Sequence, residues 1–373
     1  MKNKSKIIIP QAEGPEKSRR RAEGAEEQQQ GAVRRGSAES KGAETLRQSE
    51  TPEDLVIEKT LRPRNLEEFV GQEKLKESLQ ISIEAARQRK EPIDHILFAG
   101  APGLGKTSLS YIIAHEEDVN IKVTSGPALG RVGDLAAIIT NLEENDILFI
   151  DEIHSLNKLV EESFYPIMEE FGLDLILGKG VGAKNLRLNL PHFTLIGATT
   201  KPSLLSSPLR DRFGFFYQLN YYQAGDIEKI IKRSANILNI EIDNEAAREI
   251  AHRSRFTPRV ANRLLKKVRD FAQVKNRKID EYLVNEALLM FEIDDKGLTE
   301  TDRRILKIII EKFDGGPVGL KTLSVILGED INSLEDIYEP YLLQIGFLER
   351  TPRGRKATKE AFKYLGYDNN RTN

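Results

Sequence analysis

A glycine-rich loop follows a short apolar run near residue 100 of the chain. It fits the pattern G-x-x-x-x-G-K-[ST] and reads Gly100-Ala101-Pro102-Gly103-Leu104-Gly105-Lys106-Thr107-Ser108. Glycines at such a turn allow backbone N–H groups to surround phosphates, and the helix expected after the loop points its positive end at them. We expect Lys106 to reach the β and γ phosphates and the Thr107 hydroxyl to help hold Mg²⁺. The loop predicts a nucleoside triphosphate site.

Two adjacent carboxylates follow another apolar run. Asp151 and Glu152 come directly after Ile147–Ile150. In a nucleotide hydrolase the first can hold the water shell of the metal, and the second can polarise an attacking water. Acidic residues also favour helix N-termini, but that alternative does not explain why the pair follows a strand at this distance from Lys106. The pair favours hydrolysis over mere binding of the nucleotide.

Further hydroxyl and guanidinium groups are candidates for action near a γ-phosphate. Thr200 follows the apolar run Phe193–Ala198 and could orient water, although threonine at a strand end is also ordinary strand chemistry. Arg212 lies in a turn, where it either stabilises transition-state charge, in its own or a neighbouring subunit, or forms surface salt bridges. Arg259 follows Pro258 at an expected helix start, where it either senses the γ-phosphate or packs on its neighbours.

The elements that must position these groups indicate an α/β fold. Between residues 61 and 222, short apolar runs alternate with longer amphipathic segments, which is typical of β-α units around a parallel sheet. The expected strands are His95–Ala99, Ile121–Thr124, Ile147–Ile150 and Phe193–Ala198. Open α/β sheets bind ligands beyond the carboxyl ends of their strands, which is where the glycine-rich loop and the carboxylates lie.

The chain is expected to divide into four segments. Residues 1–51 are rich in Glu, Gln, Arg, Gly and Ser, which predicts a disordered extension. Residues 52–223 form the expected large nucleotide-binding domain. Residues 224–294 carry apolar side chains at helical spacing and form a smaller helical domain. Residues 297–373 form a third unit, with helical stretches expected near 302–310, 320–327 and 333–345 and from about residue 358.

A basic segment, residues 348–356, follows the third of these helical stretches. A helix-turn-helix followed by a basic hairpin is a common DNA reader, so the third unit is expected to be a winged helix. Residues 350–373 contain seven Lys and Arg against two acids. Phosphate contacts from such a patch would give salt-dependent binding without sequence preference.

The composition excludes several other kinds of protein. The 373 residues contain no Cys, which rules out thiol nucleophiles and Cys-built zinc sites. No apolar run approaches the ~18 residues that a membrane span needs, so we expect a cytoplasmic protein with no membrane partner. The formal net charge is -2, so DNA must be met by a local basic patch rather than by a positive field over the whole molecule.

The order of these motifs resembles that of the AAA+ ATPases, and longer blocks resemble the RuvB family of bacterial branch-migration motors. The resemblance extends from about Pro52 to Gly366. It is carried by Leu61–Arg64, Val70–Gln72, Leu148–His154, Gly197–Thr200, Thr257–Arg259 and Arg350–Arg355. The implied fold is an AAA+ P-loop domain, a small helical lid domain and a C-terminal winged helix.

The resemblance implies an assembly and partners. A RuvB-like chain is expected to form a homo-hexameric ring around double-stranded DNA, with ATP and Mg²⁺ at its subunit interfaces. It would drive branch migration of four-way Holliday junctions in recombination and DNA repair. Its expected partners are a RuvA-type junction-binding protein and a RuvC-type resolvase. The segment Leu173–Leu190 would be a projecting hairpin that docks the RuvA-type partner through Leu186 and Leu188.

The resemblance also assigns roles to the motif residues. The phosphates and Mg²⁺ would be held by Gly103, Gly105, Lys106, Thr107 and Ser108, with Asp151 and Glu152 serving metal and water. The adenine end would be lined by Leu61, Arg62 and Tyr222. The γ-phosphate would be read by the sensor Thr200, the lid sensor Arg259 and the finger Arg212, which reaches into the next subunit's site. The DNA contacts would be Arg350 and Arg355, with Arg353 between them.

Two other functions remain open on the sequence alone. A clamp-loader-like ATPase shares the nucleotide motifs but ends in a helical collar, and the Arg353-Gly354-Arg355 wing argues against it. An ATP-gated regulator would use the winged helix as a sequence reader, and a preferred base sequence without junction unwinding would favour it. The chain also departs from the RuvB pattern at Phe256, where Gly is usual, and a bulky ring beside Arg259 could alter the angle of the lid.

Overall fold

The computed structural model describes residues 59–177 and 184–367. These residues belong to two compact units, one ending at Arg303 and the other beginning at Arg304. The expected extension over residues 1–51 and the expected hairpin tip at 178–180 lie outside the described residues. Within the described ranges, no helix is long and apolar enough to cross a membrane.

A five-stranded parallel sheet forms the centre of the first unit. Its order is β2 (Ile121–Ser125), β3 (Ile147–Asp151), β6 (Thr194–Thr199), β1 (Ile96–Ala99) and β7 (Phe215–Gln218). The four predicted strands are confirmed to within one residue at each end. β7 was not predicted: its side chains alternate between half-buried and exposed because it is an edge strand, and such a short segment gives a weak apolar signal.

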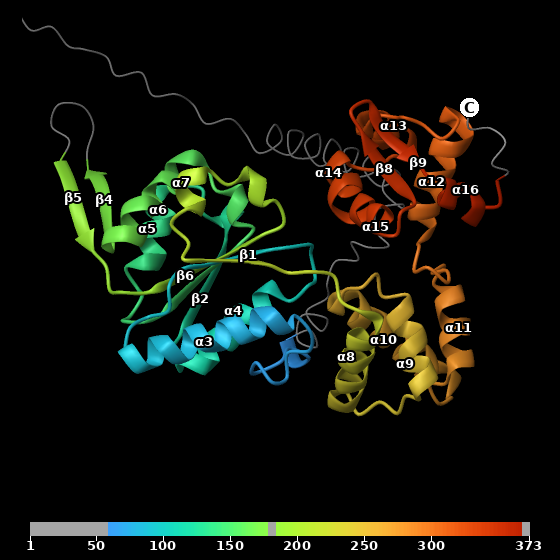
Figure 1. Cartoon of the computed structure of the whole chain (residues 1–373), viewed down its shortest axis with the longest axis horizontal. Helices are drawn as coiled ribbons and strands as arrows, with labels where there is room; N and C mark the ends of the chain where they lie inside the picture. The colour runs from blue at the N-terminus through green and yellow to red at the C-terminus, as the bar shows by residue number, and fades with distance from the viewer. Residues whose placement is uncertain (1–58, 178–183, 368–373) are drawn as a thin grey trace, which may run out of the picture. The chain divides into compact units, whose positions relative to one another are not determined.

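Two layers of helices cover the sheet (Figure 1). α3 (Glu73–Arg89) and α4 (Lys106–Glu117) lie on one face, and α5 (Val132–Ile139), α6 (Lys158–Glu170) and α7 (Ser207–Arg210) lie on the other. Successive side chains of a strand face opposite sides of a sheet. Ile96 and Phe98 of β1 therefore pack with the first layer, and Leu97 packs with the second. Burial on both faces explains why these strands have uninterrupted apolar sequences.

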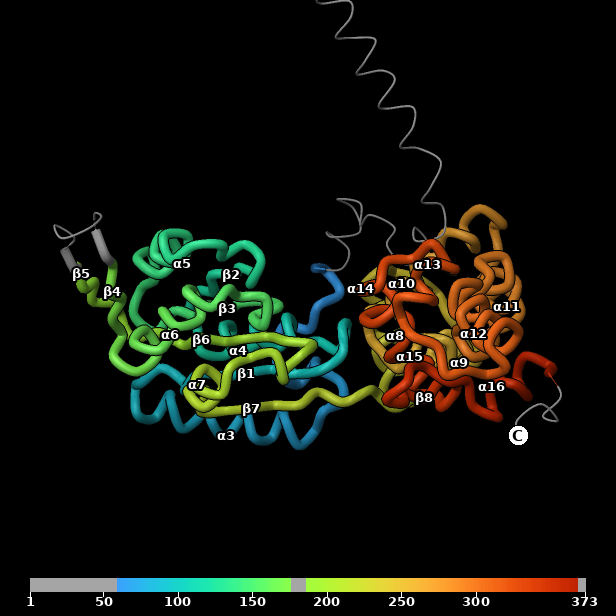
Figure 2. Tube along the Cα trace, turned by 90° about the horizontal axis from the view of Figure 1, so that it is seen from above, coloured from blue at the N-terminus to red at the C-terminus, as the bar shows by residue number. Residues whose placement is uncertain are grey.

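The predicted projecting hairpin is present. β4 (Gly172–Leu177) and β5 (Lys184–Asn189) pair antiparallel and leave the sheet domain beside α6 (Figures 1 and 2). Leu188 lies opposite Leu173 and packs against the apolar cluster between α6 and the sheet, whereas Leu186 is 42% exposed. Of the two residues expected to dock a partner, Leu186 is the more accessible.

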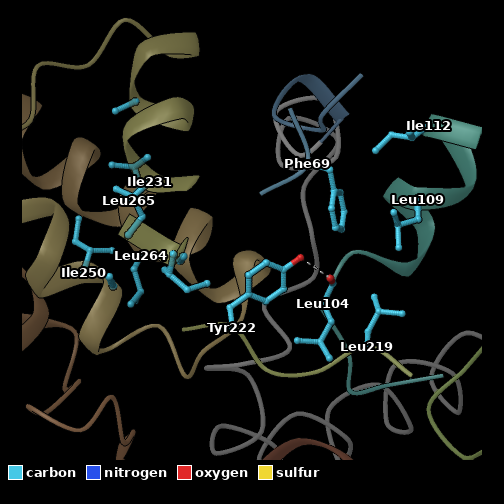
Figure 3. Packing of buried hydrophobic residues seen from close by; sticks show 14 of the residues in the cluster. Phe69, Leu104, Leu109, Ile112, Leu219, Tyr222, Ile231, Ile250, Leu264 and Leu265 are labelled. Atoms are coloured by element: carbon cyan, nitrogen blue, oxygen red, sulfur yellow. Dashed lines mark hydrogen bonds between the residues drawn. The ribbon is translucent and has the colours of Figure 1, made fainter. Parts of the chain in front are cut away.

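A helical subdomain completes the first unit. It contains α8 (Ala224–Ile237), α9 (Asn244–His252), α10 (Pro258–Lys275) and α11 (Glu281–Met290), which confirms the helical prediction for this stretch. Figure 3 shows its apolar residues, among them Ile231 and Leu264, in one cluster with Leu104 and Leu109 of the nucleotide-loop region. Tyr222 lies between the two groups, so the helical subdomain and the sheet domain share a continuous core.

The second unit has the helices and hairpin expected of a winged helix. Its elements are α12 (Glu300–Phe313, which begins in the first unit), α13 (Leu320–Leu327), α14 (Ile331–Ser333), the π-helical turn η6 (Leu334–Tyr338), α15 (Glu339–Gln344), β8 (Leu348–Thr351), β9 (Gly354–Ala357) and α16 (Lys359–Tyr364). The strands pair antiparallel and form the basic wing. The helix predicted near residues 333–345 is thus interrupted by a π turn.

Candidate nucleotide site

The glycine-rich loop joins β1 to α4 in a conformation that exposes backbone donors. Gly103 has φ 79° and Gly105 has φ 104°, both in the left-handed region that favours glycine. Gly105 precedes the first residue of α4, and no side chain caps the helix. The N–H groups of the first turn have no partner within the helix and can bind an anion. The loop therefore has the backbone geometry expected of a phosphate site.

Lys106 begins α4 and is buried in the loop. Its Nζ donates to the carbonyl oxygens of Gly100 at 2.7 Å and Ala101 at 3.0 Å. Burial lowers the pKa of Lys106, and the nearby carboxylates of Asp151 and Glu152 partly offset this shift. A desolvated ammonium gains strongly from a further anionic partner, so the position suits a triphosphate ligand.

One pocket brings together most of the predicted nucleotide-site residues. Those that line it are Leu61, Arg62, Gly103, Gly105, Lys106, Thr107, Ser108, Asp151, Glu152, Tyr222 and Arg259. They come from the segment before α3, the glycine-rich loop with the start of α4, the end of β3, the segment just before α8, and the first turn of α10. The geometry that the motifs imply is therefore present, since residues far apart in the sequence converge on one cleft.

The carboxylate end of the site contains a hydrogen-bonded network. Thr200 Oγ1 donates to Glu152 Oε2 at 3.3 Å, which ties the predicted sensor to the predicted water-polarising residue. His154 Nδ1 lies 3.3 Å from the same Glu152 oxygen and 2.9 Å from Thr199 Oγ1. The sequence analysis did not single out His154, which belongs to the same block as Asp151. The network fixes where the Glu152 carboxylate lies.

Two residues contact the phosphate loop directly: Tyr222, just before α8, and Arg259, in the first turn of α10. The Tyr222 hydroxyl donates to the carbonyl oxygen of Leu104 at 3.1 Å, a contact drawn in Figure 3, and burial raises the pKa of this tyrosine. The Arg259 backbone N–H donates to the carbonyl oxygen of Gly103 at 3.4 Å. One hydrogen bond therefore ties the loop to the segment just before α8, and the other ties it to the first turn of α10.

Arg233 of α8 lines the pocket and was missed by the sequence analysis. Its Nη1 donates to the carbonyl oxygen of Leu61 at 2.9 Å, and its Nη2 donates to Glu68 Oε2 at 2.5 Å. This hydrogen bond lowers the pKa of Glu68. Arg233 thus holds the backbone of the expected adenine end from the helical side. A single arginine in an amphipathic helix carries no sequence signal for such a role.

Gly103→Ala is expected to weaken nucleotide binding and to lower the melting temperature. A Cβ at this position would lie 2.8 Å from the Arg259 Cβ, and φ 79° is strained for alanine. Strain of this kind costs on the order of 1–3 kcal/mol. Gly133→Ala is the matched control, because its Cβ would meet nothing within 4 Å. Titration with a fluorescent nucleotide measures the affinity, and thermal melting measures the stability. Native affinity in the Gly103 variant would show that the close approach of the loop to Arg259 does not matter for nucleotide binding.

Arg212 lies outside the lining of this pocket. Its Nη2 donates to Glu169 Oε2 at 3.1 Å, its Nη1 donates to the Pro208 carbonyl oxygen at 2.6 Å, and its guanidinium lies 4.5 Å from the ring centroid of Tyr165. The described contacts hold the side chain on the turn that follows α7. Its role as a finger in a neighbouring subunit stays a prediction.

Comparison with known proteins identifies the family. Three family models match in chain order: the Holliday junction DNA helicase RuvB P-loop domain over residues 61–219, the RuvB AAA lid domain over 222–294 and the RuvB C-terminal winged helix domain over 295–366. The chain belongs to the RuvB family. Nucleotide binding and the AAA+ fold with lid and winged helix follow from this membership.

Individual relatives match over nearly their whole length. The RuvB subunit of the Holliday junction branch migration complex from Chloroflexus aggregans is 58% identical over 315 residues, which cover 84% of this chain and 90% of that protein. The Rubrobacter xylanophilus counterpart is 58% identical over 311 residues, covering 83% and 88%. The solved structure of the Thermotoga maritima RuvB motor matches with a TM-score of 0.76 and 50% identity, covering 83% of this chain and 99% of that one.

The departure from the RuvB pattern at Phe256 falls on a strained backbone position. Phe256 has φ 56°, and Arg255 before it has φ 54°. Glycine adopts such angles without the cost that a bulky residue incurs. The carbonyl oxygen of Phe256 accepts the Tyr222 N–H at 3.0 Å, which fixes the entry to the helical subdomain. The ring therefore does not prevent the backbone conformation that glycine would favour.

Proposed function

We propose that this chain is the ATP-driven motor subunit that moves the branch point of Holliday junctions in recombination and DNA repair. The observation that carries the proposal is the contact between phosphate loop and lid, made by Tyr222 and Arg259. This contact couples the state of the nucleotide to the position of α10. The RuvB family membership supplies the substrate, since relatives named as branch migration subunits are 58% identical to the chain.

The proposed ligand of the pocket is ATP with Mg²⁺. The Thr107 hydroxyl and the Asp151 carboxylate both line the pocket and are the hard oxygen donors that Mg²⁺ prefers. Among the described residues no group of three His, Cys, Asp or Glu side chains could hold a metal by itself. This donor set fits Mg²⁺, which is usually bound by one or two carboxylates together with substrate phosphates. The ion would neutralise phosphate charge, while Glu152 would orient and polarise the attacking water.

The proposed assembly is a homo-hexameric ring around double-stranded DNA. Arg212 would complete the site of a neighbouring copy, because it does not line the pocket of its own chain. The proposed domains are residues 52–223, 224–294 and 297–373, with 1–51 as an extension. The winged helix would contact the DNA backbone through Arg350, Arg353 and Arg355. Sequence-independent phosphate contacts suit a motor that must pass any sequence.

The proposed partners are a RuvA-type junction-binding protein and a RuvC-type resolvase. The hairpin β4–β5 supports the first, because it projects beside α6 and carries the exposed Leu186. Leu188 would contribute mainly by packing against the apolar cluster between α6 and the sheet. The resolvase is proposed from family membership alone. We also propose that the protein acts in the cytoplasm.

A strand-migration assay on a synthetic four-way junction tests the proposed function. The native chain, with a RuvA-type protein, is expected to convert the junction into duplex products in the presence of Mg-ATP. Lys106→Ala is expected to give none, because the ammonium that binds the phosphates is lost. DNA-stimulated hydrolysis without arm migration would overturn the proposal in favour of a clamp-loader-like activity. Binding to one preferred base sequence without unwinding would overturn it in favour of a regulator.

A further inference from the structure

A buried carboxylate holds both expected DNA-binding arginines of the wing. The Glu339 side chain is only 3% exposed. Its Oε1 accepts from Arg350 Nε at 2.6 Å and from Arg355 Nε at 2.9 Å, and its Oε2 accepts from Arg355 Nη2 at 2.9 Å. A buried carboxylate is costly unless it is paired and hydrogen-bonded. Glu339 meets this condition through the two arginines.

The fold brings these three residues together from three elements. Glu339 opens α15 directly after the π turn η6, and Pro340 follows it without an N–H to continue the helical ladder. The hairpin register places Arg350 of β8 opposite Arg355 of β9. Like charges directly opposite each other on a hairpin repel. The carboxylate of Glu339 lies against both guanidinium groups and offsets this repulsion.

The two arginines differ in their exposure and in how many of their nitrogens contact Glu339. Arg355 is 18% exposed and commits Nε and Nη2 to Glu339 as a bidentate pair. Arg350 is 51% exposed and commits only Nε to Glu339, while its Nη2 lies 3.7 Å from Glu335 Oε1. The terminal nitrogens of Arg350 are therefore the part of the pair best able to reach a phosphate.

We infer that Glu339 is a positioning residue for DNA binding: it anchors the wing through Arg355 and aims the terminal nitrogens of Arg350 at the DNA backbone. The inference rests on the proposed DNA contact of the wing. Glu339 also reduces the charge of the pair from two to one. The wing then binds through an oriented contact rather than through the largest possible positive charge, and an oriented contact keeps more of its affinity as salt screens the charges.

The test compares full-length variants for binding to a short fluorescent duplex by anisotropy, at salt concentrations from about 50 to 200 mM. Glu339→Gln removes the charge but keeps the shape, and is expected to weaken binding about tenfold at the upper salt, the loss of one charged hydrogen-bond contact. The slope of log affinity against log salt is expected to steepen by about 0.9, because one more guanidinium charge is uncompensated. Glu349→Gln is the matched control: it changes the net charge equally, on an exposed wing residue, and should not weaken binding.

A double-mutant cycle separates positioning from a general loss of structure. In an Arg350→Ala background, Glu339→Gln is expected to have a much smaller effect on affinity, because the part of its action that aims Arg350 is already lost and only the anchoring through Arg355 remains. A tenfold loss that persists there would overturn the inference. Thermal melting checks folding, and Glu339→Asp, which keeps the charge but shortens the side chain, should lose affinity with an unchanged salt slope. Native affinity and slope in both Glu339 variants would also overturn it.

The same series distinguishes this inference from the proposed function. If Arg350→Ala and Arg353→Ala bind duplex as the native chain does, the proposed DNA face is wrong. If these two variants weaken binding but Glu339→Gln leaves affinity and slope unchanged, only the positioning role of Glu339 is wrong.

Discussion

Replacing Arg212 with alanine is expected to abolish ATP turnover by the assembled protein while leaving ATP binding intact. The guanidinium does not line the pocket of its own chain, so nucleotide affinity should not depend on it within one subunit. An arginine finger stabilises charge that develops during phosphoryl transfer, and its loss lowers the rate by about 10³-fold or more. Phosphate release at saturating Mg-ATP and equilibrium binding of a labelled nucleotide measure the two properties separately.

To reach a phosphate of another copy, the Arg212 guanidinium must turn away from its present partners. In its ion pair with Glu169 the Arg212 side chain is 22% exposed and the carboxylate side chain is 56% exposed, and a pair with such an exposed partner contributes about 1 kcal/mol. Exchange of this carboxylate for a phosphate of another copy therefore breaks one weak ion pair, and a larger rotation also breaks the Nη1 hydrogen bond to the Pro208 carbonyl oxygen. The cation–π contact with Tyr165 can persist while the terminal nitrogens change partner.

Mixing two inactive variants tests whether the site is shared between subunits. Arg212→Ala keeps Lys106, and Lys106→Ala keeps Arg212, so a mixed ring contains interfaces with both groups intact. Turnover is expected to reappear in the mixture although each variant alone has none. Arg210→Ala, on the neighbouring exposed arginine, is the control and should keep turnover. Hydrolysis by assembled Arg212→Ala alone, at the native rate, would contradict the finger assignment.

The parts of the site that the sequence predicted are those that depend on local geometry. The loop that ends at Lys106 and the two carboxylates at the end of β3 are each contained in a few consecutive residues, so their backbone chemistry can be inferred from neighbouring residues. The central strands were found because burial on both faces requires uninterrupted apolar runs. Family resemblance then supplied what local chemistry could not, such as the convergence of Leu61 and Tyr222 on the same pocket.

The residues that were missed act through contacts between distant segments. Arg233 binds the backbone near Leu61 from 172 positions away in the chain. His154, just after β3, meets Thr199 at the end of the neighbouring strand β6, and Glu339 meets the wing arginines only because the π turn and the hairpin bring them together. Propensity and periodicity describe local structure, so pairings of this kind require the folded chain. Phe256 shows the same limit, since its positive φ is not visible in its residue type.

Glu152→Gln is expected to bind ATP with native affinity and to hydrolyse it at least about 10²-fold more slowly. Loss of a positioned general base typically costs 10²–10⁴-fold in rate. Glutamine keeps the size of the side chain and can still accept the Thr200 hydrogen bond that the carboxylate accepts at 3.3 Å. It cannot take a proton from water at neutral pH. Glu152→Gln should therefore keep its ATP affinity but lose turnover, whereas Lys106→Ala should lose both.

The hydrogen bond between Thr200 and Glu152 allows a second test, of whether Thr200 acts through the carboxylate. Thr200→Val removes the donor to Glu152 but leaves the carboxylate, so it should slow hydrolysis by less than Glu152→Gln does. Adding it to Glu152→Gln should cause little further loss, because residues that act as one unit are not additive. Glu162→Gln, on an exposed pair with Lys158, is the charge-matched control. Native turnover in Glu152→Gln would show that another group activates the water, and additive losses in the double variant would show that Thr200 acts independently of Glu152.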